Sequence, residues 1–216
     1  MLFFVLVWLP IWTGAPLWAA EPATANGAKP ARGRIVVLGD SITAGLGLND
    51  PADAWPARLQ QKIDAAGLPF EVVNAGVSGD TTAGGLARVD FSVRKDTDLA
   101  IVALGGNDLL QGLDTGETRA NLDGIVKKLQ ARHIRVLVAG IGAPPQIGGG
   151  YARDFNALFA SVAKARGAVL YPDLLDGVGR NPALKQGDGI HPNARGAAII
   201  AGKLAPVVAK ALAAHR

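Results

Sequence analysis

The sequence predicts an α/β protein whose parallel sheet is covered by helices on both faces. Short apolar runs alternate along the chain with segments of helical spacing, as they do where right-handed crossovers join parallel strands. The runs are continuously apolar, which is typical of strands that are buried on both faces. A chain of 216 residues, 49% of them hydrophobic and 19% charged, is long and apolar enough to form one domain with a substantial core.

Each element of this fold is predicted from its own stretch of sequence. The expected strands are Arg34 to Leu38, Phe70 to Asn74, Leu99 to Leu104, Ile134 to Ile141 and Ala168 to Tyr171. Between them, apolar residues recur every three to four positions. The expected helices are Pro51 to Ala66, Thr81 to Lys95, Thr115 to Ala131, Tyr151 to Arg166 and Asn193 to Ala213. In the first helix Trp55, Leu59 and Ile63 share one face, and Gly67 ends it.

The N-terminal 20 residues differ from the rest, because they carry no charged side chain. Pro10 and Pro16 interrupt this apolar run, which disfavours a long straight membrane span. Ala23-Thr24-Ala25 matches the A-x-A pattern that a signal peptidase reads, although Ala20 also fits as a cleavage point. We therefore expect export to the periplasm or secretion. A retained membrane anchor is the alternative, because no Lys or Arg precedes the apolar run.

The expected division of the chain is a signal peptide over residues 1–25, a flexible lead-in over 26–33 and a single domain over 34–216. The net charge of +4 comes from Lys and Arg spread along the chain, without the basic runs of a nucleic-acid-binding or polybasic membrane segment. There is no cysteine, which excludes disulfides, a thiol nucleophile and a Cys-ligated zinc.

Polar clusters follow four of the five predicted strands. They are Gly39-Asp40-Ser41, Ala75-Gly76-Val77-Ser78-Gly79-Asp80, Gly105-Gly106-Asn107-Asp108 and, after a longer loop, Asp188-Gly189-Ile190-His191. Ligands of an open parallel sheet bind beyond the carboxyl ends of its strands. The four clusters are therefore expected to meet at one edge and to form a site.

Acyl transfer needs a nucleophile, a base, a group that orients the base, and donors for the oxyanion. His191 is the best candidate base of the three histidines, because His133 falls in a predicted surface turn and His215 in the tail. Asp188 stands three residues before His191 and can reach its Nδ1 from the same segment. Ser41 comes directly off the first strand, where a sharp turn can expose its hydroxyl.

Oxyanion donors are also available at this edge. Gly79 has no Cβ and permits close approach of backbone, Asn107 offers a side-chain amide, and Ser41 offers its own N–H. Taken alone, a serine at this position is more often a helix N-cap than a nucleophile. Ser78 lies in a near miss of Gly-x-Ser-x-Gly, with Asp80 in place of the second glycine, and is interpreted as a turn residue.

The ordered set of clusters resembles the SGNH, or GDSL-type, hydrolase family. Gly39-Asp40-Ser41-Ile42 is similar to the first block, with Ile in place of Leu, and Gly79 is similar to the glycine of the second. Gly105-Gly106-Asn107-Asp108 resembles the third block, and Asp188 to Asn193 resembles the last. The stretches VSGDTTAGGLARV and DGIHPN look most like the bacterial periplasmic thioesterase, lysophospholipase and arylesterase branch.

The resemblance implies a three-layer, flavodoxin-like α/β/α sandwich that hydrolyses acyl esters or thioesters. It implies Ser41 as nucleophile, His191 as base and Asp188 as the acid that orients it. It further implies an oxyanion hole from the N–H groups of Ser41 and Gly79 and the Asn107 amide, with Asp40 supporting the Ser41 turn. No metal or organic cofactor is expected.

Substrate is less constrained. The loop Gly142 to Gly150 follows the fourth strand, and we expect it to wall a groove for medium to long acyl chains, although a plain flexible connection explains it equally well. A small-molecule or lipid acyl ester is the expected partner, without nucleic acid and compatible with transient contact with a membrane surface.

Other functions stay open at this stage. A carbohydrate acetyl esterase is the first alternative, although only two Tyr and Trp55 remain after residue 25 to stack on sugars. A non-catalytic doubly wound binding protein is the second, and transfer of the acyl group to an acceptor other than water is the third.

Overall fold

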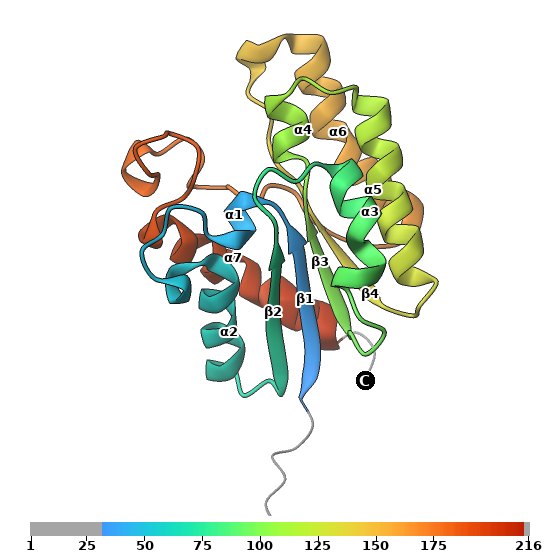
Figure 1. The fold of residues 1–216 in the computed structure, drawn as a ribbon, viewed down its shortest axis with the longest axis vertical. Helices are drawn as coiled ribbons and strands as arrows, with labels where there is room; N and C mark the ends of the chain where they lie inside the picture. Colours follow the sequence, from blue (N-terminus) through green and yellow to red (C-terminus); the bar gives the residue numbers. More distant parts are fainter. Residues whose placement is uncertain (1–31, 214–216) are drawn as a thin grey trace, which may run out of the picture. The chain divides into compact units, whose positions relative to one another are not determined.

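The computed structural model describes residues 32–213, so that the predicted signal peptide, most of the lead-in and His215 lie outside the described residues. Five strands form one sheet in the order β2-β1-β3-β4-β5, and every neighbouring pair is parallel (Figure 1). The strands are β1 (Gly33–Gly39), β2 (Phe70–Gly76), β3 (Leu99–Ala103), β4 (Arg135–Ala139) and β5 (Val169–Tyr171). This is the flavodoxin-like order, and it confirms the expected fold class.

Helices cover the sheet on both faces. They are α1 (Ser41–Ala44), α2 (Trp55–Ala65), α3 (Thr82–Ser92), α4 (Gly106–Leu110), α5 (Thr115–Gln130), α6 (Gly149–Arg166) and α7 (Ala194–Ala213). Helices α2 and α7 pack on one face of the sheet, whereas α3, α5 and α6 pack on the other (Figure 1). Three short 3₁₀ turns lie in the connections, at Pro51–Asp53, Pro145–Ile147 and Pro182–Leu184.

Strand β1 shows why its sequence is continuously apolar. Ile35 and Val37 pack among the residues of α2 and α7, whereas Val36 and Leu38 pack beneath α3 and α5. All four are almost completely buried. Each such side chain contributes about 1.5–3 kcal/mol through burial. The strand that ends at the candidate nucleophile is therefore firmly held in the core.

Helix α4 is not among the helices expected from the sequence. Gly105 adopts a φ of +121°, which turns the chain out of β3 directly into a short helix. Asp108, in the first turn of α4, is buried and accepts hydrogen bonds from the backbone N–H and the hydroxyl of Thr82. This tertiary contact holds α4 against α3, and local sequence does not reveal it.

Candidate active site

The turn from β1 into α1 presents Ser41. Asp40 is the N-cap of α1, and its Oδ1 accepts a hydrogen bond from the Ile42 N–H at 3.0 Å. Ser41 is the first residue of the helix, so the alternative interpretation of Ser41 as the cap is wrong. Because Asp40 satisfies the helix end, the hydroxyl of Ser41 is left to make another contact.

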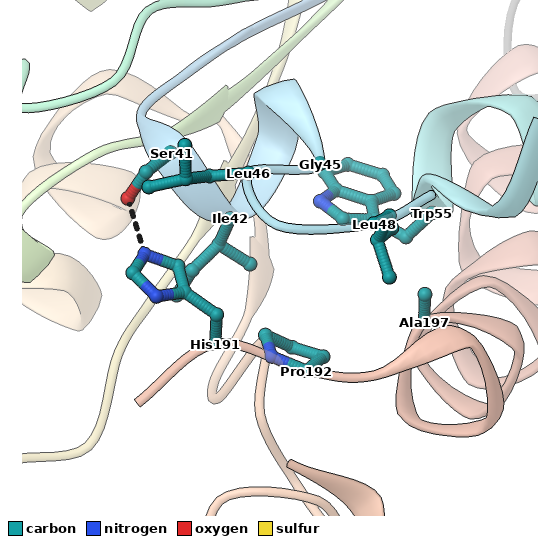
Figure 2. Close-up of a pocket in the computed structure, with 9 residues that line it drawn as sticks. All are labelled: Ser41, Ile42, Gly45, Leu46, Leu48, Trp55, His191, Pro192 and Ala197. Carbon is teal, nitrogen blue, oxygen red and sulfur yellow. Dashed lines mark hydrogen bonds between the residues drawn. The ribbon is translucent and has the colours of Figure 1, made fainter. Parts of the chain in front are cut away.

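That contact is with His191, which lies 150 positions later in the chain. Ser41 Oγ and His191 Nε2 are 2.9 Å apart (Figure 2). On the other side of the ring, His191 Nδ1 is 2.6 Å from Asp188 Oδ2. The structure therefore brings the three residues together in one hydrogen-bonded row, from the hydroxyl through the imidazole to the carboxylate.

Asp188 also holds its own loop in shape. Its Oδ1 accepts from the backbone N–H of Ile190 at 2.8 Å and of His191 at 3.0 Å. The bond from the His191 ring, followed by these two amides, lowers the pKa of Asp188 to about 2. The carboxylate is therefore ionised at neutral pH and accepts the Nδ1 proton, which leaves Nε2 free to accept the proton of Ser41.

The pKa of Asp40 shifts in the opposite direction, because this residue is only 2% exposed. Burial raises the pKa of Asp40 to about 6, although the hydrogen bond from Ile42 lowers it in part. The charge of His191 also lowers this pKa, and that of Asp80 raises it. A Cβ at Gly106 would lie 3.0 Å from the Asp40 carboxylate, so glycine leaves room for the buried acid.

Three candidate oxyanion donors lie at the same edge. Within residues 32–213, neither the Ser41 nor the Gly79 backbone N–H donates to any protein acceptor. Asn107, in α4, uses its Nδ2 to donate to the Asp80 carbonyl at 2.8 Å, which leaves its second amide hydrogen available. These three groups are therefore the candidate donors to a negatively charged oxygen beside Ser41.

The backbone conformation gives a further reason for glycine at position 79. No protein atom of the described chain lies within 4 Å of the place where a Cβ would be, so packing against protein does not require glycine. Its φ of +83° does, since residues with a Cβ rarely adopt that conformation.

The competing serine and the second histidine are placed elsewhere. Ser78 is exposed in the turn after β2, and His133 is exposed in the turn before β4, as expected. Within residues 32–213, no group of three or more His, Asp or Glu side chains is placed to hold a metal ion.

Comparison with known proteins shows the family to which this chain belongs. The sequence profile of the GDSL-like Lipase/Acylhydrolase family matches residues 37–199, which include the whole serine–histidine–aspartate row. The chain belongs to this family. It is accordingly an ester hydrolase.

Several relatives of the GDSL-like family are similar over most of their length. Esterase TesA of Pseudomonas aeruginosa is 40% identical over 159 residues, which cover 73% of this chain and 79% of TesA. The Escherichia coli protein named thioesterase 1/protease 1/lysophospholipase L1 is 36% identical over 160 residues, covering 74% of this chain and 75% of that protein. The crystal structure of AlinE4, an SGNH-hydrolase family esterase, superposes with a TM-score of 0.70 at 44% identity, covering 85% of this chain and 98% of AlinE4.

Two hollows lie near the site of this GDSL-like enzyme. One of about 10 Å³ lies between Ser41, His191 and Trp55, and it can hold no more than a single water (Figure 2). The other, of about 730 Å³, lies at the carboxyl ends of β4 and β5.

The walls of the larger cavity were only partly expected. Gly142, Ala143 and Pro144 line it, from the loop that the sequence indicated. The opposite wall comes from the stretch between Pro172 and Asn181, which carries no motif and was therefore missed. Only the position of this stretch directly after β5, at the ligand-binding edge, could have pointed to it.

Proposed function

We propose that this enzyme hydrolyses carboxylic esters and thioesters of acyl chains through a covalent acyl-enzyme on Ser41. The observation that carries the proposal is the hydrogen-bonded row from Ser41 Oγ through His191 to Asp188. A hydroxyl that only caps a helix has no need of a histidine that is itself oriented by a carboxylate. This row is the arrangement that activates a serine for acyl transfer.

The reaction follows from the geometry. Ser41 Oγ attacks the acyl carbon while His191 Nε2 accepts its proton, and the ionised Asp188 stabilises the resulting imidazolium. The negative oxygen is stabilised by the N–H groups of Ser41 and Gly79 and by the amide of Asn107. His191 then returns the proton to the leaving alcohol or thiol, and water repeats the sequence on the acyl-enzyme. Activity is expected to fall at acidic pH, because a protonated His191 cannot accept the serine proton.

Medium to long acyl chains are the proposed substrates. The cavity of about 730 Å³ offers room for them, and its wall residue Ile141 lies next to Gly106, which adjoins Asn107. A sugar substrate has less support. Trp55, the aromatic residue that lines the small hollow beside Ser41, is buried, and the highly exposed Phe91 lies at the far end of α3.

Transient contact with a lipid surface is part of the proposal. Seven large apolar side chains of the described chain are exposed, and five of them lie in the segments that follow the carboxyl ends of the strands, one of these in α4. These five are Leu46, Val77, Leu110, Ile147 and Ile190. Exposed apolar groups gathered around an active site are typical of a surface that meets an apolar partner.

The first test is labelling with a fluorophosphonate probe, followed by intact mass. Wild type is expected to gain a single adduct, Ser41→Ala to gain none, and the matched control Ser78→Ala to be labelled like wild type. Circular dichroism checks that each variant is folded. No adduct on folded wild type, or an adduct that survives in Ser41→Ala, would overturn the assignment.

The second test is a chain-length series of p-nitrophenyl esters from acetyl to palmitoyl. We expect kcat/KM to be highest for medium to long chains, and Leu175→Trp, which fills the larger cavity, to lower it for these chains while sparing the acetyl ester. A steep preference of wild type for the acetyl ester would contradict the proposed substrate class.

The third test compares micellar lysophosphatidylcholine with monomeric p-nitrophenyl butyrate. The double variant Val77→Ser, Ile147→Ser should lose activity several-fold on micelles only. Phe91→Ser removes an equally apolar, 90% exposed side chain from the opposite end of the molecule, and it should change neither activity. Equal losses in both variants would remove the case for surface contact.

A further inference from the structure

Arg88, on α3, makes contacts that the proposed mechanism has not used. Its side chain is only 19% exposed. Nη2 donates to the carbonyl of Gly39 at 2.9 Å, Nη1 to the carbonyl of Ala75 at 2.9 Å, and Nε to Asp80 Oδ2 at 2.6 Å. One guanidinium therefore joins the end of β1, the end of β2 and the loop that follows β2.

The carbonyls of Gly39 and Ala75 lie at the carboxyl ends of β1 and β2. Gly39 and Gly76 are the last paired residues of β1 and β2, and the Gly39 carbonyl also accepts a hydrogen bond from the Val77 N–H at 3.0 Å. Arg88 therefore adds a charged donor to a carbonyl that the sheet already pairs, and its side chain ties α3 to the ends of both strands. The Gly39 carbonyl belongs to the peptide group that leads into Asp40 and Ser41. Its orientation therefore bears on the direction of the Ser41 N–H.

The ion pair with Asp80 connects Arg88 to the other two oxyanion donors, Gly79 and Asn107. Asp80 directly follows Gly79, and its side chain is 12% exposed. Its carbonyl accepts the hydrogen bond from Asn107 Nδ2 at 2.8 Å. Fixing Asp80 thus fixes the residue next to Gly79 and the acceptor that orients the Asn107 amide.

The start of α3 is shaped to admit this ion pair. A Cβ at Gly84 would collide with Oδ1 of Asp80, so glycine in the first turn of the helix lets the carboxylate lie against it. A glycine in the first turn of a helix is unfavourable by itself. In the structure Gly84 makes room for the acid that Arg88 binds.

We propose that Arg88 is the positioning residue of the oxyanion hole, which holds the Ser41, Gly79 and Asn107 donors in their mutual geometry. The proposal rests on the proposed function of these donors. Arg88 acts through Gly39, Ala75 and Asp80 and does not itself touch the substrate. A shift of donors by about 1 Å costs on the order of 100-fold in rate, which sets the scale of the effect.

The test is steady-state kinetics on p-nitrophenyl butyrate with Arg88→Ala and Arg88→Lys. We expect Arg88→Ala to lower kcat about 100-fold and to change KM by less than about threefold, because the donors act mainly in the transition state. Lysine carries one ammonium and cannot reach three acceptors in three directions, so Arg88→Lys should recover only part of the loss.

Arg166→Ala is the matched control. Arg166 is another partly buried arginine that pairs with an aspartate, Asp123, between α6 and α5. Its removal should cost stability but leave kcat within about twofold, since no contact links it to the donors. Should Arg88→Ala fail to fold, Arg88→Lys and Asp80→Asn carry the same comparison.

A double-mutant cycle separates positioning from a general structural role. If Arg88 acts through the oxyanion donors, Arg88→Ala should cost much less in an Asn107→Ala background than in wild type. Fully additive losses, or a loss in KM alone, would overturn the proposal. An unchanged kcat in Arg88→Ala, with Ser41 still labelled by fluorophosphonate, would reject this inference and leave the proposed function intact.

Discussion

The two halves of the carboxyl edge are built differently. Around β1, β2 and β3, polar side chains are buried and hydrogen-bonded, including Asp40, Asp108 and Thr82. Around β4 and β5 lies a cavity of about 730 Å³, walled in part by a glycine- and proline-rich loop. The contrast indicates that the first half is built to place atoms accurately, where charge develops, and the second to leave room. Substitutions should accordingly cost much in the first half and little in the second.

The largest effect is expected for Asp188→Asn. The segment that carries Asp188 leaves β5 and crosses to the first half, where it meets Ser41 through His191. An amide at position 188 would present a donor to Nδ1 and favour the wrong tautomer, so kcat should fall by on the order of 10³–10⁴-fold. Because this side chain is 44% exposed, the midpoint of thermal unfolding should hardly change. A loss of less than tenfold would show that His191 does not need its carboxylate.

Asn107→Ala should have the next largest effect. Removing one oxyanion donor lowers kcat by about 100-fold or more, while KM changes less, since the donor acts mainly on the transition state. Steady-state kinetics on a soluble ester measures both. An unchanged kcat would show that Asn107 is not an oxyanion donor. It would also argue against a first half in which side-chain positions are critical for catalysis.

Asp40→Asn tests how much the buried carboxyl of the first half lowers the free energy of unfolding. The folded protein keeps a proton on Asp40 up to about pH 6, whereas the unfolded chain releases it near its ordinary pKa of 3.8. Between these values the folded state binds more protons, so the free energy of unfolding falls as pH rises, by up to ~3 kcal/mol above pH 6.

Asparagine stays neutral and avoids this loss. Urea unfolding at pH 4.5 and pH 7.5 should therefore show Asp40→Asn gaining stability relative to wild type as pH increases. A difference that is the same at both pH values would mean that Asp40 does not titrate in this window.

The smallest effects are expected at two glycines. Beyond its own local backbone, neither glycine has a protein atom within 4 Å of the Cβ position. Gly79, in the first half, has a φ of +83°, and Gly79→Ala should cost about 1–2 kcal/mol in stability and lower kcat. Gly149 begins α6 in the second half, and Gly149→Ala should change stability by less than ~1 kcal/mol and leave kcat unaltered. Equal effects at the two positions would break the comparison between the halves.

Sequence reasoning succeeded where one strand or one short segment holds the whole signal. Ser41 follows a strand that is apolar enough to be recognised, and Asp188 lies on the same loop as His191, so local pattern indicates the place of each along the chain. The meeting of Ser41 with His191 could be expected because parallel strands present their carboxyl ends at one edge.

It failed where contacts between distant segments decide the structure. Helix α4 depends on Asp108 reaching Thr82, and the contacts of Arg88 span 49 residues to Gly39, 13 to Ala75 and 8 to Asp80. No periodicity or spacing in the chain encodes these pairings. The far wall of the larger cavity was missed for the same reason, because it is made of residues without a pattern of their own.

The short loop that carries both Asp188 and His191 makes the pairing of acid and base independent of Ser41. The carboxylate is bonded to the ring and to two amides of its own loop, whereas one bond joins that loop's imidazole to Ser41. Base and acid thus form a preassembled unit whose internal hydrogen bonds do not involve the nucleophile. The downfield proton resonance of His191 Nδ1 should therefore survive in Ser41→Ala.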